Sequence, residues 1–359
     1  MDFRLSEDQK LLQETIRKFL ESECPPTRLH EIFDADDAYD RELWHNMAEL
    51  GLAGLALPER YGGAGLELID LALAAEVLGH QAAPGPFLSH ALAGLSILLA
   101  GSDAQRDAWL PALASGESLG TVGLGEGAQQ SSSAIRRIQR TGDRATGEMR
   151  HVLFGADADL IVLATADEEL VVVERGADGL SARQVDAVDR SRRLWDLELS
   201  DTPCQPLPGG AATAPRVRDA GLCLLAADAF GGATRAVEIS VAYAKERQQF
   251  GVTIGHFQAL KHQLANMAAS VEPSRGLYWY AAHAWDALPE QSERLAAVAK
   301  AHVTDRFAQA ARDAVEAHGG IGFTWEGDIQ IWLKRAIFDR NYLGSPVVHR
   351  ARSARLAGW

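Results

Sequence analysis

The stretch that decides the fold reads Glu-Arg-Gln-Gln-Phe-Gly at residues 246–251, and Gly-His-Phe-Gln follows at residues 255–258. An arginine near a helix C-terminus can simply complement the helix dipole, and Phe250 can simply belong to a core. However, an arginine, two glutamines and an aromatic ring beside glycine also form a surface that can grip a pyrophosphate and stack on a planar ring. This stretch alone leaves both interpretations open.

A second glycine-rich stretch lies further along the chain, at residues 316–326, and reads Glu-Ala-His-Gly-Gly-Ile-Gly-Phe-Thr-Trp-Glu. Three glycines within four residues allow another group to approach the backbone closely. Their N–H groups can also bind an anion. The alternative is an ordinary helix C-cap followed by a turn.

Outward from these stretches, the hydrophobic periodicity predicts helices at both ends of the chain and strands between them. Ser6 is expected to cap the first helix, and Pro58, Gly62 and Gly63 to lie in a loop. Strand-sized apolar runs occupy 160–165 and 170–174, and residues 203–210 read as a connector. Further helices are expected over 41–50, 66–79, 106–113, 220–249, 257–288, 294–318 and 328–337.

Two of these predicted helices contain residues that disfavour a helix. The Gly231-Gly232 pair is expected to interrupt the helix over 220–249, and Pro273 to kink or break the one over 257–288. The element order predicts an N-terminal α-helical domain over 1–118, a middle β-domain over 119–208 and a C-terminal helical bundle over 215–359.

Composition narrows the class of function. A net charge of −14 over 359 residues disfavours nucleic acid as a partner. The three cysteines, Cys24, Cys204 and Cys223, have neither metal-ligand spacing nor an even count, so we expect no metal site and a reducing, cytoplasmic setting. The first residues lack an apolar signal core, and the apolar runs are too short to span a membrane.

Taken together, the two glycine-containing stretches resemble segments of the acyl-CoA dehydrogenase family. The resemblance extends to Pro58–Gly63, to Phe257–His262 and to the terminal helices, in the order of the family. It implies a mainly α fold with a central β-domain: N-terminal helices, a β-barrel-like middle domain and a C-terminal four-helix bundle. It also implies an FAD cofactor shared between neighbouring subunits.

The resemblance assigns cofactor-binding residues to both stretches. Gly319 and Gly320 would contact the diphosphate of FAD. Glu316 stands where the family usually has glutamine, and an unpaired carboxylate there would repel a diphosphate. The side chains expected on FAD are Arg247, Gln249, Phe250 and Gln258.

The middle segment departs from the family pattern. The family's loop facing the flavin ring is replaced by residues 123–133, which end in three serines that could equally form a solvated turn. The family's strand motif Trp-Ile/Val-Thr/Ser-Asn-Gly is replaced by residues 147–152. The half of the site that would bind the flavin ring therefore looks eroded.

The expected catalytic base is also missing, although α-proton abstraction needs one. Leu343 occupies the position of the usual glutamate, and Gly221 occupies the alternative position. Asp219 falls where relatives help to hold the acyl-CoA. Asp228 shares a helix face with Gly221, and if buried it would have the raised pKa that suits a base. The competing interpretation pairs Asp228 with a basic residue on an adjacent helix.

These losses favour a dehydrogenase subunit that acts on a bulky acyl-CoA, such as a steroid-derived one, beside a homologous chain in a heterotetramer. A homo-oligomer is the other assembly, and electron-transfer flavoprotein or a similar acceptor would receive the electrons. Two alternatives remain: a catalytically silent subunit that only grips FAD, and a flavin oxidase or monooxygenase of the same fold.

Overall fold

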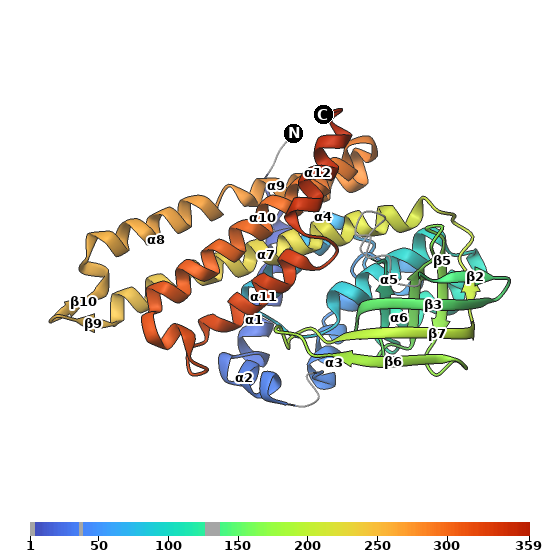
Figure 1. The fold of residues 1–359 in the computed structure, drawn as a ribbon, viewed down its shortest axis with the longest axis horizontal. Coiled ribbons are helices and arrows are strands. Elements are labelled where there is room, and N and C mark those ends of the chain that lie inside the picture. The colour runs from blue at the N-terminus through green and yellow to red at the C-terminus, as the bar shows by residue number, and fades with distance from the viewer. Residues whose placement is uncertain (1–3, 36–38, 126–136) are drawn as a thin grey trace. The chain divides into compact units, whose positions relative to one another are not determined.

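The structure is a computed structural model that describes residues 4–35, 39–125 and 137–359 (Figure 1). These residues form helices, then strands, then helices again, as predicted. The helices are α1 (Glu7–Glu23), α2 (Pro26–Asp34), α3 (Arg41–Glu49), α4 (Leu68–His80), α5 (Phe87–Ala100), α6 (Asp103–Ala114), α7 (Thr213–Glu246), α8 (Gln258–Val271), α9 (Ser274–Ala287), α10 (Pro289–His318), α11 (Ile329–Asn341) and α12 (Pro346–Leu356). The strands are β1 (Gly120–Gly123), β2 (Gln139–Thr141), β3 (Arg144–Leu153), β4 (Leu160–Ala164), β5 (Leu170–Glu174), β6 (Leu180–Val185), β7 (Leu194–Pro203), β8 (Gln205–Pro206), β9 (Gln248–Gln249) and β10 (Val252–Thr253).

The chain divides into two compact units. One unit contains residues 1–31, 72–83 and 222–359, and the other contains residues 32–71 and 84–221. Helices α2, α4 and α7 each contribute residues to both units. This division follows contacts rather than sequence order, so the three sequence domains at 1–118, 119–208 and 215–359 stay a prediction.

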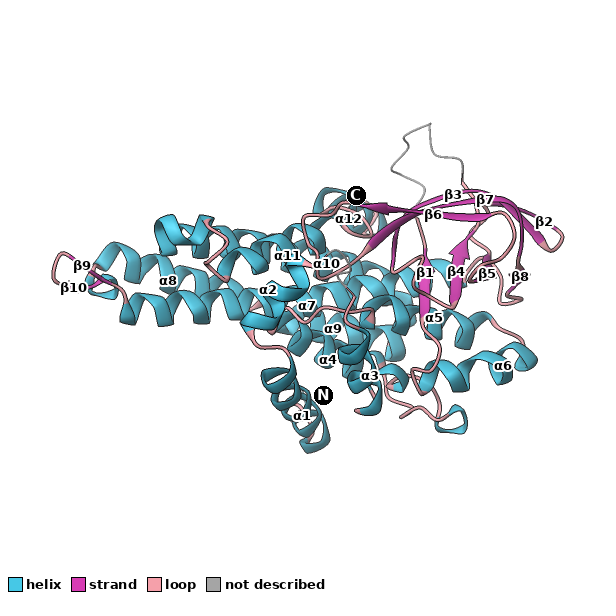
Figure 2. Ribbon diagram, turned by 90° about the horizontal axis from the view of Figure 1, so that it is seen from below, coloured by secondary structure: helices cyan, strands magenta, loops and turns pink. Residues whose placement is uncertain are grey.

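The unit with most of the strands contains two four-stranded sheets among its described residues (Figure 2). One has the order β1-β4-β5-β8, with β1 and β4 parallel, and the other has the order β2-β3-β7-β6 and is antiparallel throughout. The sheets meet at Gly123, where an added Cβ would lie 2.7 Å from the Met149 side chain of β3. This packing builds the β-rich part of the predicted fold class.

The other unit is a bundle built mainly from α7, α8, α9, α10 and α11. Buried side chains from α7, α8, α10 and α11 form one hydrophobic cluster that includes Ala244, Leu264 and Val315. Pro273 separates α8 from α9, so the predicted break is confirmed. Proline lacks the N–H that a continuous helix would need there.

The expected interruption at Gly231-Gly232 is wrong, because α7 runs through both glycines. An added Cβ on Gly231 would lie 1.9 Å from the Glu76 carbonyl oxygen, and one on Gly232 would lie 2.3 Å from the Phe307 ring. Close packing of neighbouring helices therefore outweighs the weak helix propensity of glycine.

The same helix is long and apolar enough to cross a membrane by length and composition alone. However, 83% of its most apolar window is buried in the protein. This burial is typical of a core helix.

At the N-terminal end, Ser6 caps α1 as expected. Its hydroxyl accepts a hydrogen bond from the Gln9 N–H, and the Gln9 side chain accepts one from the Ser6 N–H. This reciprocal capping box fixes the start of the helix.

Candidate functional site

The stretch 246–251 leads from the end of α7 into a β-hairpin. Strands β9 and β10 pair antiparallel, and the Ile254 N–H donates to the Arg247 carbonyl oxygen at 2.7 Å. The two-residue loop is Phe250-Gly251, with φ angles of 52° and 79°. Two positive φ angles in a two-residue hairpin define a type I′ turn, in which asparagine and glycine are the usual residues.

Phe250 is therefore the anomalous residue of this hairpin. A bulky side chain in the left-handed region is strained, and this ring is also 92% exposed. Burial cannot explain a phenylalanine here, because among the residues that the structure describes the only aromatic ring found beside it is that of Phe257, at 6.1 Å between centroids. Strain combined with exposure points to a surface that something else covers.

The polar side chains predicted to bind a cofactor lie around this tip. Arg247, Gln249 and Gln258 are all exposed, and Gln258 begins α8 after a 3₁₀ turn, Ile254–His256, that follows the hairpin. No ion-pair partner of Arg247 is found among residues 4–35, 39–125 and 137–359. A free guanidinium and two amide side chains make a donor set that suits phosphate oxygens.

The glycine-rich stretch forms a short 3₁₀ segment, Gly319–Phe323, directly after α10. Gly319 has a φ angle of 63°, which favours glycine, and an added Cβ on Gly319 or Gly320 would meet no atom within 4 Å. Packing within this chain therefore does not require glycine at position 320. The open backbone leaves room for a ligand or a second chain to approach.

A stack of two aromatic rings brings the hairpin and the glycine stretch together. Tyr243, one turn before Arg247, stacks on His318, directly before Gly319, with 4.5 Å between ring centroids and 21° between planes. Burial lowers the pKa of His318, while the hydrogen bond with the Ala314 carbonyl oxygen opposes the shift. The neutral ring can thus pack against tyrosine while its Nδ1–H bonds to that carbonyl.

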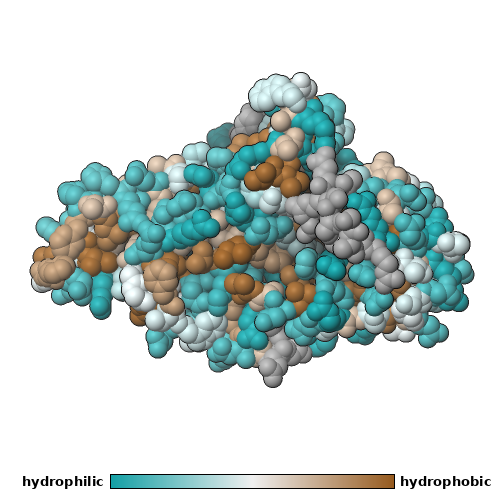
Figure 3. Space-filling model, viewed as in Figure 1, coloured by the Kyte–Doolittle hydropathy of each residue, from teal (hydrophilic) through white to brown (hydrophobic). Residues whose placement is uncertain are grey.

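Apolar side chains surround this end of the bundle (Figure 3). Phe323 is 77% exposed, and Ile321, Trp325, Val252 and Phe257 are exposed to a smaller degree. Exposed aromatic rings gathered beside polar donors are typical of a protein or ligand interface. Sequence reasoning had not singled out Phe323 as a contact residue.

Glu316 is the one predicted contact whose charge opposes an anion. It is exposed in the last turn of α10, and the Gly319 N–H donates to its backbone carbonyl oxygen. Because water solvates an exposed carboxylate, its repulsion of a nearby phosphate is weaker than that of a buried one.

Asp228 lies in a buried ion pair and so matches the competing interpretation. Its carboxylate accepts from Arg335 Nε at 2.9 Å and from Nη2 at 2.6 Å, and Arg335 Nη1 donates to the Ala83 carbonyl oxygen at 3.0 Å. A carboxylate held by two charge-assisted hydrogen bonds is stabilised in its ionised form and is poorly placed to abstract a proton. The geometry therefore argues against Asp228 as the base.

Asp219 is also buried, in the N-terminal part of α7 that belongs to the strand-bearing unit. Its neighbour Arg218 donates to Glu168 and to the Leu124 carbonyl oxygen, each at 3.0 Å. The role of Asp219 in holding the acyl-CoA stays a prediction.

The position of the family's usual base lies in a tightly held turn. Leu343 has a φ angle of 56°, and its carbonyl oxygen accepts a hydrogen bond from His349 Nε2 at 2.9 Å. Lys300, which sequence reasoning missed, donates to the carbonyl oxygens of Asp339, Arg340 and Gly344. The sequence feature that could have identified Lys300 is that it is a single lysine within an alanine-rich helical stretch.

Most of the predicted flavin-facing loop lies outside the described residues, which resume at Arg137. The replaced strand motif at 147–152 forms part of β3, where Gly147 has a φ angle of 140° and packs within 2.5 Å of the Arg137 carbonyl oxygen, measured from an added Cβ. This glycine serves strand packing in β3.

Comparison with known proteins gives two matches to family models. Residues 6–117 match the acyl-CoA dehydrogenase N-terminal domain, and residues 221–357 match the acyl-CoA dehydrogenase C-terminal domain. Together the two matches cover more than half of the chain.

Individual relatives agree with these matches. The acyl-CoA dehydrogenase IpdE2 of Mycobacterium tuberculosis is 34% identical over 343 residues, which cover 95% of this chain and 94% of the relative. The solved steroid acyl-CoA dehydrogenase Tcur3481-Tcur3483 G363A variant is similar with a TM-score of 0.90 and 30% identity, over 98% of both chains. The ChsE4-ChsE5 complex from M. tuberculosis shares the fold, with a TM-score of 0.90 and 24% identity, over 100% of this chain and 99% of that one.

Proposed function

The chain belongs to the acyl-CoA dehydrogenase family, and from this membership we propose that it is an FAD-binding subunit of a heteromeric acyl-CoA dehydrogenase. The reaction would be α,β-dehydrogenation of an acyl-CoA thioester. Members of the family are flavoproteins.

The observation that carries the proposal is Phe250. Its strained, exposed ring contacts one aromatic ring, Phe257, in the described part of the chain, and the neighbouring Arg247 has no ion-pair partner there. A dinucleotide supplies both missing partners, because an adenine or ribose can cover the ring while phosphate oxygens accept from the guanidinium.

The residues present fit the adenosine and diphosphate half of FAD. Gln249 and Gln258 offer amide donors, and the open backbone at Gly319 and Gly320 allows close approach of a phosphate. When bound, FAD would supply the acceptor for the hydride that leaves the β-carbon. The role of this chain's own residues at the bundle end would be to bind and orient that cofactor.

The proton at the α-carbon needs a base, and this chain has no carboxylate at either position where the family carries one. Leu343 and Gly221 cannot accept a proton, and Asp228 is held by Arg335. We therefore assign the base to a homologous partner subunit. If this chain supplies the base instead, Asp219 is the candidate carboxylate. The exposed apolar side chains of Phe323, Ile321, Trp325, Val252 and Phe257, together with Phe250, form an apolar rim. We expect this rim to contact such a subunit.

The substrate class is proposed from the relatives. Tcur3481-Tcur3483 is called a steroid acyl-CoA dehydrogenase. A bulky, steroid-derived acyl-CoA is thus the first substrate to test, with electron-transfer flavoprotein or a similar acceptor taking the electrons.

The test is to express the chain alone and together with a homologous dehydrogenase chain, and to measure bound flavin per subunit and acyl-CoA-dependent reduction of an artificial acceptor. We expect activity only in the mixed sample, with fewer flavins than subunits. An active, flavin-saturated homotetramer would refute the heteromeric proposal. A mixed complex that binds flavin and never turns over would instead favour the silent-subunit alternative, and oxygen consumption without an acceptor would favour an oxidase.

A matched pair of variants tests the role of the hairpin directly. Arg247→Ala should weaken FAD binding by about tenfold or more, since it removes a charge-assisted contact to phosphate. Arg355→Ala, which removes an equally exposed arginine from α12, should leave FAD binding unchanged. Equal affinities in both variants, measured by equilibrium dialysis of flavin, would separate Arg247 from the cofactor.

A further inference from the structure

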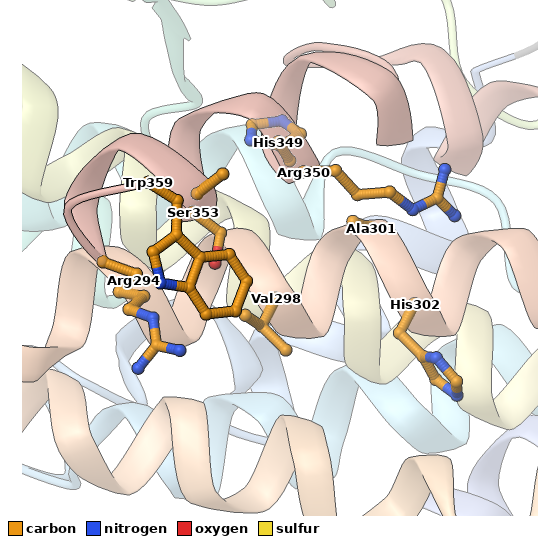
Figure 4. A pocket seen from close by; sticks show the side chains of 10 residues that line it. Arg294, Val298, Ala301, His302, His349, Arg350, Ser353 and Trp359 are labelled. Atoms are coloured by element: carbon orange, nitrogen blue, oxygen red, sulfur yellow. The ribbon is translucent and has the colours of Figure 1, made fainter.

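A cavity of about 250 Å³ lies between α10 and α12, at the end of α12 that leads to Trp359 (Figure 4). Arg294, Val298 and His302 face it from α10 at intervals of four residues, which places them on one side of the helix. Most of the other residues that line the cavity have only a methyl or hydroxymethyl side chain, so their side chains cannot fill the cavity. These small residues are Ala301, Ser353, Ala354 and Ala357.

Two arginines, Arg294 and Arg350, line the cavity although the whole chain is acidic. Arg294 is exposed and has no ion-pair partner within the described part of the chain, because neighbouring Glu293 pairs with Arg352. At the other end Arg350 pairs with Asp305. Burial lowers the pKa of His302, and Arg306 and Arg350 lower it further while Asp305 opposes the shift. Arg294 is thus the lining arginine whose charge is left for an anion.

One wall of the cavity is aromatic. Trp359 is 91% exposed, and its indole lies between Arg294 and Val298 over α10 (Figure 4). An exposed indole beside a cavity leaves a ring face that a flat group can cover. The remaining wall is mostly aliphatic.

A buried polar atom lies in the same group of lining residues. His349 is 3% exposed, its Nε2–H donates to the Leu343 carbonyl oxygen, and its Nδ1 has no hydrogen-bond partner among the described residues. Buried polar atoms without partners are rare in proteins and ask for an explanation. A bound molecule or water in the cavity would provide one.

We infer that this cavity binds a small aromatic anion, with its ring against Trp359 and Val298 and its negative group on Arg294. The size fits, because an apolar cavity of about 150 Å³ already holds benzene, and the remaining volume accommodates a carboxylate or a phosphate. The site is separate from the residues proposed to bind FAD, since those lie on the hairpin and the glycine stretch at the opposite end of α10.

The experiment is isothermal titration of the full chain, with its partner subunit if it requires one, using benzoate, acetate and benzyl alcohol. Benzoate carries both ring and charge and should bind, whereas acetate and benzyl alcohol should each bind about tenfold or more weakly. Adenosine 5′-monophosphate is the fourth probe. If this nucleotide binds more tightly than benzoate, and its binding survives Arg247→Ala but is lost in Arg294→Ala, the cavity selects a mononucleotide. If it binds more weakly than benzoate, the cavity selects an aryl carboxylate. Acetate that binds as well as benzoate, or benzoate that does not bind, would overturn the inference.

Variants locate the bound anion. Arg294→Ala should weaken benzoate binding by about tenfold or more, and Ala354→Leu should abolish it by filling the cavity. Arg355→Ala lies on α12 outside the cavity lining and should have no effect. Thermal unfolding of each variant tests whether the protein remains folded. Benzoate binding that survives both cavity variants, or that is lost in Arg247→Ala, would place the anion elsewhere and overturn the inference.

Discussion

Asp228 and Arg335 form a buried ion pair, so the predicted role of Asp228 as a base gives way to a structural role. The pair joins α7 to α11 and is almost completely buried. Removing one partner of such a pair leaves an uncompensated charge, which costs more stability than the pair itself contributes.

We therefore expect Asp228→Asn to lower the free energy of unfolding by about 3–5 kcal/mol. Urea unfolding measures this loss. The double variant Asp228→Leu with Arg335→Met should recover a large part of it, because neither charge is then left alone. A fully stable Asp228→Asn protein that has lost activity in the mixed complex would restore Asp228 as a base.

His90 is a residue-scale source of pH dependence. Its Nε2–H donates to the Leu113 carbonyl oxygen at 3.0 Å, and its Nδ1 accepts from the Gly120 N–H at 3.2 Å. Burial lowers the pKa of His90 to about 4, although the hydrogen bond to Leu113 opposes this shift. The neutral ring is thus required in the folded state.

Because the pKa of His90 is lowered in the folded state, acid pH reduces the stability of the protein. Between about pH 6.5 and 4 the unfolded chain binds a proton at this histidine that the folded protein does not, so stability is present above this window and is lost as the pH falls through it. His349, whose pKa is also lowered to about 4, adds to the same slope. His90→Gln should reduce the slope of unfolding free energy against pH by about one proton. An unchanged slope would contradict the assignment.

At the scale of elements, the crossing of α4 and α7 depends on two glycines. An added Cβ on Gly79 would lie 2.0 Å from the Asp228 carbonyl oxygen, and one on Gly231 would lie 1.9 Å from the Glu76 carbonyl oxygen. The two helices therefore touch through their backbones. Gly231 and Gly232 are both occupied in helix packing.

Gly231→Ala should accordingly destabilise the protein by about 1–3 kcal/mol or more, because the methyl group forces the helices apart. Gly276→Ala is the matched control: Gly276 lies within α9, and an added Cβ meets nothing within 4 Å. The control should be neutral or stabilising by up to about 1 kcal/mol. Thermal unfolding of both variants is the measurement, and equal midpoints would contradict the backbone contact.

At the scale of the whole molecule, the exposed apolar rim at the hairpin end of the bundle is the feature that a lone chain leaves unexplained. Phe323 and Phe250 are its most exposed members. The proposed assembly would bury both rings and would complete the cofactor site at the same surface.

Phe323→Glu should therefore shift the complex toward smaller species in sedimentation velocity, because a charge would be desolvated in the interface. Leu11→Glu, at a similarly exposed leucine on α1, should not change the assembly. If both variants retain the mass of the unmodified complex, the rim does not form the interface.

The parts of this protein that sequence could predict are those with a local cause. Helical spacing, the Ser6 cap and the break at Pro273 each depend on residues within one or two turns, and each was confirmed. The arginine, glutamine, aromatic and glycine stretches likewise pointed to the family, which the comparisons then showed.

The amino-acid sequence by itself determined the order of helices and strands and the family, because periodicity, caps and short motifs act along the chain. Only the tertiary structure decided that α7 continues through Gly231, that Asp228 pairs with Arg335, that Tyr243 stacks on His318 and that Phe250 stands exposed in a strained turn. The first three depend on groups that meet across segments distant in sequence, which packing in three dimensions brings together, whereas the strain and exposure of Phe250 become visible only in the folded hairpin.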